Sequence, residues 1–106
     1  MTSKQSAATN LRIFQINIHF HDEPDPEALK KTFDKAINWI RYMPNCWLVL
    51  TSSDARRWYG RLSPLLGDSD TMLITEIDPD AISAWIQPWI IDWIDKSKKR
   101  MQGQAV

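Results

Sequence analysis

The chain has 106 residues, of which 43% are hydrophobic and 25% charged, so it is long enough to bury one core, and tandem domains and wholesale disorder are excluded. Thirteen Lys and Arg against thirteen Asp and Glu exclude the strongly basic composition of proteins that coat nucleic acid. With a single cysteine no internal disulfide can form, and the chain contains no apolar run of about 18 residues that could span a bilayer. We therefore expect a cytoplasmic protein.

The first elements follow a polar stretch. Residues 1–10 lack an apolar core segment, which predicts a flexible N-terminal arm rather than a secretory signal. Residues 13–20 then alternate apolar and polar side chains, which is typical of a strand with one buried face. Asp25 and Pro26 form a cap and first turn, and apolar residues at spacings of three and four predict a helix that continues toward Ile40.

The middle of the chain predicts two strands and a second helix. The pattern predicts a short edge strand at 40–43, a turn at Pro44 and a central strand at 46–51. Ser52 or Ser53 then caps the second helix. This helix is expected to stop near Gly67.

The last part of the chain predicts one more strand and one more helix. Residues 71–77 form a strand whose inward face stays open, because two apolar sets compete for it. Asp78-Pro79 repeats the cap-and-proline start, and Ile and Trp residues follow in a broad apolar stripe that Pro88 should bend or interrupt.

This order of elements predicts an α+β fold. A ferredoxin-like βαββαβ sandwich has two helices on one face of a four-stranded antiparallel sheet, and here a C-terminal amphipathic helix is added. We expect a single domain at 11–95, which includes that helix, and a basic, polar tail at 96–106.

Short patterns between residues 13 and 77 carry a family resemblance. They are Trp39, the segment Trp47-Leu48-Val49-Leu50-Thr51-Ser52, the helix end Leu62-Ser63-Pro64-Leu65-Leu66, and Asp70-Thr71-Met72-Leu73-Ile74. The chain thus resembles the SinR-like proteins, distant relatives of the CRISPR-associated Cas-two nuclease family. The resemblance implies a ferredoxin-like homodimer and, in active relatives, an aspartate at the end of the first strand that holds a divalent metal between protomers.

The chain departs from that pattern at the aspartate. The equivalent position falls near His19 or Phe20, and the nearest acid, Asp22, comes two or three residues later. A slip of one residue turns a strand side chain to the other face, so Asp22 is a poor substitute. The resemblance therefore supports the fold and weakens a nuclease function.

A metal site is the first candidate. His19 and His21 share a strand face, Asp22 is adjacent, and antiparallel pairing should bring Cys46 and Asp70 toward the same edge. The spacing is not diagnostic, and histidines at a sheet edge are usually solvated. If the chain is a nuclease, Asp22 and His19 are the catalytic candidates, His19, His21 and Asp22 the metal ligands, and Mg²⁺ or Mn²⁺ the cofactor; otherwise we expect no cofactor.

Basic residues are the second candidate. Arg56, Arg57 and Arg61 lie on the second predicted helix, where they either contact nucleic-acid phosphates or form an ordinary solvated face. The basic residues after 95 could favour a membrane surface, but Asp92 and Asp95 would be repelled by anionic lipid, so membrane binding is not expected.

The second face of the sheet is the third candidate. If the first strand buries its even residues, its odd residues face outward, joined by residues of the central strand, and the mixed face suits a two-fold homodimer. The last helix is expected either to cover this face or to lie across the partner. The predicted interface residues are Gln15, Asn17, Trp47, Val49, Trp85, Trp89 and Trp93.

Three hypotheses for function follow. The preferred one is a non-catalytic ferredoxin-like homodimer that acts as an interaction or nucleic-acid-associated module. The alternative is a metal-dependent endonuclease with its site at the dimer interface. The third is a protein whose last helix docks on a membrane surface or a partner.

Overall fold

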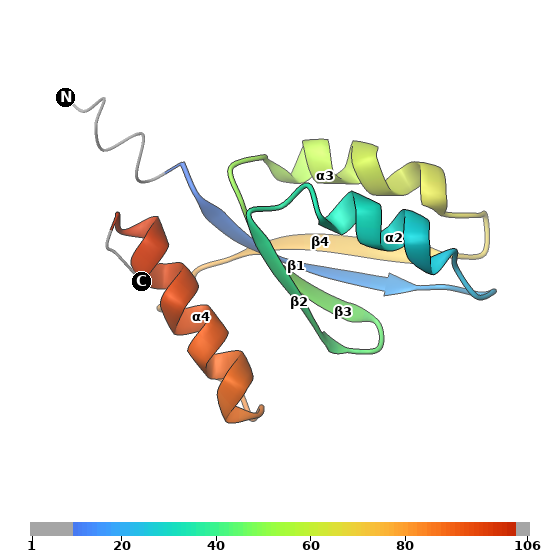
Figure 1. The fold of residues 1–106 in the computed structure, drawn as a ribbon. Helices are drawn as coiled ribbons and strands as arrows, with labels where there is room; N and C mark the ends of the chain where they lie inside the picture. The colour runs from blue at the N-terminus through green and yellow to red at the C-terminus, as the bar shows by residue number, and fades with distance from the viewer. Residues whose placement is uncertain (1–9, 104–106) are drawn as a thin grey trace.

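The computed structural model describes residues 10–103, so most of the predicted N-terminal arm, residues 1–9, lies outside the described part (Figure 1). In chain order the elements are β1 (Arg12–His19), α2 (Pro26–Phe33), β2 (Asn38–Met43), β3 (Cys46–Thr51), α3 (Ala55–Leu62), the 3₁₀ turn η1 (Ser63–Leu65), β4 (Thr71–Ile77) and α4 (Pro88–Met101).

The four strands form one antiparallel sheet in the order β2-β3-β1-β4. Helices α2 and α3 lie side by side over one face, and α4 lies against the other (Figure 1). The predicted small α+β domain with a four-stranded antiparallel sheet is therefore confirmed.

The larger core lies between the sheet and the helices α2 and α3. Even-numbered residues of β1 enter it, as the alternation predicted, and the ring of Phe33 stacks on Trp47 with centroids 5.0 Å apart and on Trp58 at 6.0 Å. Stacked rings of this kind add to the free energy gained from their buried area.

Trp47 and Val49 belong to this core, so their predicted place on the second face is wrong. Antiparallel pairing sets Ile16 opposite Trp47 and Phe14 opposite Val49, and residues opposite each other share a face. Every residue of β3 is buried, so no polar alternation in this strand indicated which side faces the helices.

The smaller core lies under α4. Ile90 and Ile94 pack on Leu48, with Ile40 and Ile77 at the margin. The two cores also show which residues of β4 face each helix layer, which the sequence had left open. Met72 and Ile74 face α2 and α3, whereas Ile77 faces α4.

The predicted start of the last helix at Asp78 is wrong. Asp78 instead closes a turn, in which its carbonyl accepts from the N–H of Ala81 and its carboxylate from the N–H of Asp80. The helix begins at Pro88, whose missing N–H is tolerated in the first turn. It continues to Met101, so the basic residues assigned to a tail after residue 95 are helical.

Candidate nucleic-acid interface

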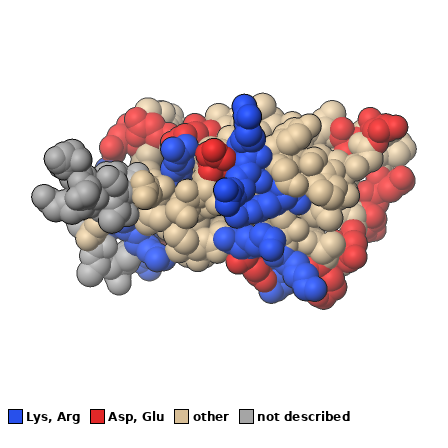
Figure 2. Space-filling model, turned by 90° about the horizontal axis from the view of Figure 1, so that it is seen from above, with Lys and Arg blue, Asp and Glu red and all other residues tan. Residues whose placement is uncertain are grey.

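A band of Lys and Arg side chains crosses the layer formed by α2 and α3, and acidic side chains lie on both sides of it, most densely at the right of the view (Figure 2). The two helices contribute Lys30, Lys31, Arg56, Arg57 and Arg61, which we call the basic band. The net charge of zero therefore conceals a local concentration of positive charge on this face.

Helix α3 positions the arginines through its first turn. The carboxylate of Asp54 accepts from the N–H of Arg57 at 2.8 Å and caps the helix, so the predicted caps Ser52 and Ser53 are wrong. Ser53 instead donates its N–H to the hydroxyl of Thr51. With α3 starting at Ala55, Trp58 faces the sheet, fully buried.

The guanidinium group of Arg61 lies over the indole ring of Trp58. Its guanidinium carbon is 4.8 Å from the centroid of the indole ring, and its Nη1 is buried with no hydrogen-bond acceptor in the part of the chain described. Burial, and after it the charge of Arg57, lowers the pKa of Arg61. A buried donor without an acceptor is destabilising by about 1–3 kcal/mol. An anion beside the two guanidinium groups would offset the repulsion between them.

None of the ion pairs formed within residues 10–103 involves an arginine of α3. Two neighbouring guanidinium groups without carboxylates are suited to bind phosphate oxygens, because the planar guanidinium offers paired donors. Sequence reasoning found these arginines; it missed the stack on Trp58, for which the only signal was the spacing of three residues along one helix.

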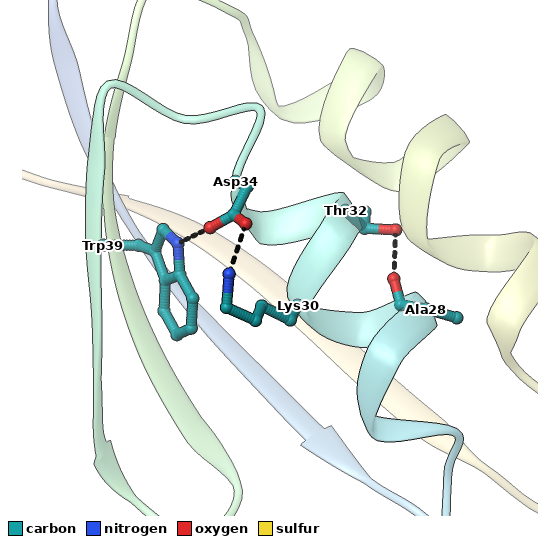
Figure 3. A network of polar contacts seen from close by, with 5 residues as sticks. All are labelled: Ala28, Lys30, Thr32, Asp34 and Trp39. Atoms are coloured by element: carbon teal, nitrogen blue, oxygen red, sulfur yellow. Dashed lines mark hydrogen bonds and ion pairs between the residues drawn. The ribbon is translucent and has the colours of Figure 1, made fainter.

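Lys30 plays a different role in the band. Its ammonium contacts the carboxylate of Asp34 at 2.8 Å, and that carboxylate accepts from the indole N–H of Trp39 at 2.9 Å (Figure 3). These contacts raise the pKa of Lys30 and lower that of Asp34. The positive charge of Lys30 is thus matched locally, and the network orients Trp39 on the edge strand β2.

The strand-end residues do not assemble into a metal site. His19 and Asp22 are exposed, and Cys46 is buried on the sheet, where its sulfur accepts from the side-chain amide of Asn17 at 3.1 Å. Within residues 10–103 no three His, Cys, Asp or Glu side chains are placed to hold a metal ion. Within one chain His19, His21 and Asp22 therefore form no such group, and the predicted site shared by two protomers stays a prediction.

Asp70 fastens the loop after β1 to the loop before β4. Its carboxylate accepts the N–H of His21 at 2.7 Å and that of Gly67 at 2.8 Å. These two hydrogen bonds, the one from Gly67 first, hold the pKa of Asp70 below its usual value. The carboxylate thus has a structural task at the strand ends.

This gives a pH-dependent prediction for Asp70→Asn. Because the pKa is lowered in the folded state, the stabilisation is complete above the usual carboxyl value and is lost as pH falls through the folded value. We expect the variant to be less stable than the parent at pH 7 and the difference to shrink below about pH 4, as measured by urea unfolding. Asp68→Asn, at a neighbouring exposed carboxylate, is the control. A stability difference between the parent and Asp70→Asn that is the same at pH 7 and below about pH 4 contradicts the prediction.

The remaining predicted interface residues are spread over the second face. Gln15 accepts from the hydroxyl of Tyr42, whose pKa is raised by burial and then by Cys46. Trp93 is half-buried against the core under α4, whereas Trp85 is fully exposed and Trp89 half exposed. The last helix thus covers part of the second face of its own sheet.

No helix in the described residues is both long and apolar enough to cross a membrane. Comparison of the chain with protein-family models, with curated proteins and with solved structures finds no match.

Proposed function

We propose that this chain is a non-catalytic ferredoxin-like homodimer, resembling the SinR-like group, that binds nucleic acid through its basic band. The order of elements from β1 to β4, the sheet order β2-β3-β1-β4 and two helices on one face support the ferredoxin-like class. The absence of a net positive charge means that binding depends on local geometry.

The observation that carries the proposal is the pair Arg57 and Arg61. Neither is neutralised by a carboxylate within residues 10–103, and the two positive charges repel each other. A phosphate group supplies negative charge and several acceptor oxygens at once. Nucleic acid presents such groups at regular spacing, which suits a band that crosses two helices.

We propose a non-catalytic role because of the positions of the carboxylates of Asp22 and Asp70. Strand β1 ends at His19, so Asp22 follows three residues beyond it, and Asp70 already accepts two backbone N–H groups. Neither acid lies in the basic band where the phosphates are proposed to bind.

Nucleic-acid binding is tested with Arg57→Ala/Arg61→Ala. Losing two phosphate contacts should reduce the slope of log affinity against log salt by about 1.4 for a single strand and about 1.8 for a duplex. The measurement is fluorescence anisotropy of labelled RNA and duplex DNA at several salt concentrations. The control is Lys99→Ala/Arg100→Ala, exposed basic residues on α4 across the sheet, which should leave the slope unchanged.

Equal salt slopes for the parent and the α3 variant would overturn the proposal. An equal reduction of the slope in the α3 variant and in the α4 control would overturn it as well. Circular dichroism melting shows whether the α3 variant is folded. The same oligonucleotides incubated with Mn²⁺ decide the catalytic question, because cleavage that Asp22→Ala abolishes would establish the nuclease instead.

A further inference from the structure

Strand β4 is an edge of the sheet with its outer side open. In this sheet the N–H of Ile18 on β1 donates to the carbonyl of Asn45, on the β3 side, at 2.9 Å. Backbone groups along a strand point alternately to its two neighbours. Because the even-numbered Ile18 bonds to the β3 side, the even-numbered residues of β1 bond to β3 and the odd-numbered residues bond to β4. Their partners in β4 are also odd-numbered, as in the pair Gln15 and Thr75.

The even-numbered residues of β4, Met72, Ile74 and Glu76, therefore direct their N–H and carbonyl groups away from the sheet. No backbone or side-chain hydrogen bond to these groups is formed by residues 10–103. Unpaired backbone groups in a row are a template for another strand.

The two edges of the sheet differ in how they are protected. Strand β2 has an irregular register between Arg41 and Met43, and Pro44 follows directly. Such irregularities and charges discourage strand pairing. Strand β4 pairs regularly with β1 along its whole length, contains neither proline nor glycine, and has Glu76 as its one charge.

We propose that a second copy of this chain pairs with β4 in antiparallel orientation, about a two-fold axis that passes through Ile74. This inference rests on the homodimer of the proposed function and identifies its interface. Met72 then bonds to Glu76 of the other copy, and Ile74 to its own counterpart, so every outward group within this stretch has a partner.

The length of the paired strand favours this register. A two-fold axis through Leu73 would confine the strand pairing to residues 71–75 of β4. An axis through Thr75 would confine the strand pairing to residues 73–77. With the axis through Ile74 the whole strand pairs, and Glu76 faces Met72.

The same pairing covers an exposed apolar side chain. Leu73 is 65% exposed in the single chain and lies on the face of the sheet opposite α2 and α3. In the dimer it stands across from Thr75 of the other copy as a closely spaced, non-hydrogen-bonded pair. Apolar area that water reaches in the monomer is thereby covered.

An axis perpendicular to the sheet also keeps both helix layers on one side. Helix α3 packs over β4, so the α3 helices of the two copies become neighbours across the axis. The two basic bands then lie on one continuous face, where a single nucleic acid can contact both.

The test is the mass of the protein in solution, measured by light scattering or sedimentation without nucleic acid. We expect the parent chain to be a dimer at tens of micromolar and Glu76→Pro to be a monomer. Proline is tolerated on an edge strand where its missing N–H would face solvent, so the domain should stay folded. Glu76→Ala, which removes the same charge and the 3.7 Å contact with Arg12, should remain a dimer.

A cross-linking experiment covers the case in which Glu76→Pro unfolds. A Leu73→Cys protein mixed with a Thr75→Cys protein should form a disulfide faster than either protein alone, because only this register sets the two positions opposite each other. Cys46 is buried and common to all samples. A monomeric parent, a dimeric proline variant that is folded, or equal cross-linking in all mixtures would each overturn the interface. Failure of nucleic-acid binding alone would leave these results unchanged.

Discussion

Trp58→Ala is expected to lower the free energy of unfolding by about 3–5 kcal/mol, the usual loss when a large aromatic side chain is removed from a core. The indole of Trp58 is 0% exposed, stacks with Phe33, and lies under the guanidinium of Arg61. Its N–H also donates to the hydroxyl of Thr51 at 3.1 Å. Urea unfolding monitored by circular dichroism measures the loss.

The neighbouring residue provides the control. Tyr59 is on the same helix but 59% exposed, so Tyr59→Ala should change the stability by no more than about 0.5 kcal/mol. Similar losses in both variants would contradict the prediction, because burial in the core under α3 would then not explain the effect. A parent chain near the lower end of the usual range of about 5–15 kcal/mol would be left marginal by the Trp58 substitution.

Ile94→Asp is expected to detach α4 from the sheet. Ile94 is buried against Leu48 in the smaller core, and an unpaired carboxylate there would be strongly destabilising. Because residues 78–87 join α4 to β4 without a strand or helix, undocking should not break the sheet. Amide hydrogen exchange should show loss of protection in α4 and retained protection in β1.

Ile91→Asp is the matched control, since Ile91 is exposed on the same helix. It should leave the protection of α4 unchanged. If Ile94→Asp also removed protection from β1, the docking of α4 would be inseparable from the folding of the sheet.

The strands could be located from the sequence, but their faces could not all be assigned. In β1, polar residues alternate with apolar ones, so the pattern alone identified the buried side. In β3 every side chain is buried, and the face of Trp47 depends on its pairing with Ile16. Such a register is set by two strands together and is absent from the pattern of either one.

The start of α4 likewise depends on tertiary packing and not on local sequence alone. Asp78-Pro79 and Gln87-Pro88 both have a proline suited to a first helical turn, and Asp78, the better N-cap residue, favoured the wrong start. Packing decides: Ile90 and Ile94 cover the apolar patch around Leu48, and the helix that presents them begins at Pro88.

The candidate site was predictable in its residues and not in its environment. The charges of Arg57 and Arg61 and their position on one helix follow from the sequence. That Arg61 Nη1 is buried without an acceptor depends on the tertiary packing around Trp58. Likewise Asp70 could be taken for a metal ligand until its two backbone donors were known.

The separation of charge across the surface affects how the protein must be handled. With an isoelectric point near 6.7, the molecule carries almost no overall charge in neutral buffer, so copies repel one another weakly at long range. Colloidal behaviour then depends on short-range attractions, among them acidic ends meeting cationic bands on neighbouring molecules. Solubility should be lowest in dilute neutral buffer and should improve with moderate salt, because at about 0.1 M salt the attraction between charges is screened beyond about 10 Å.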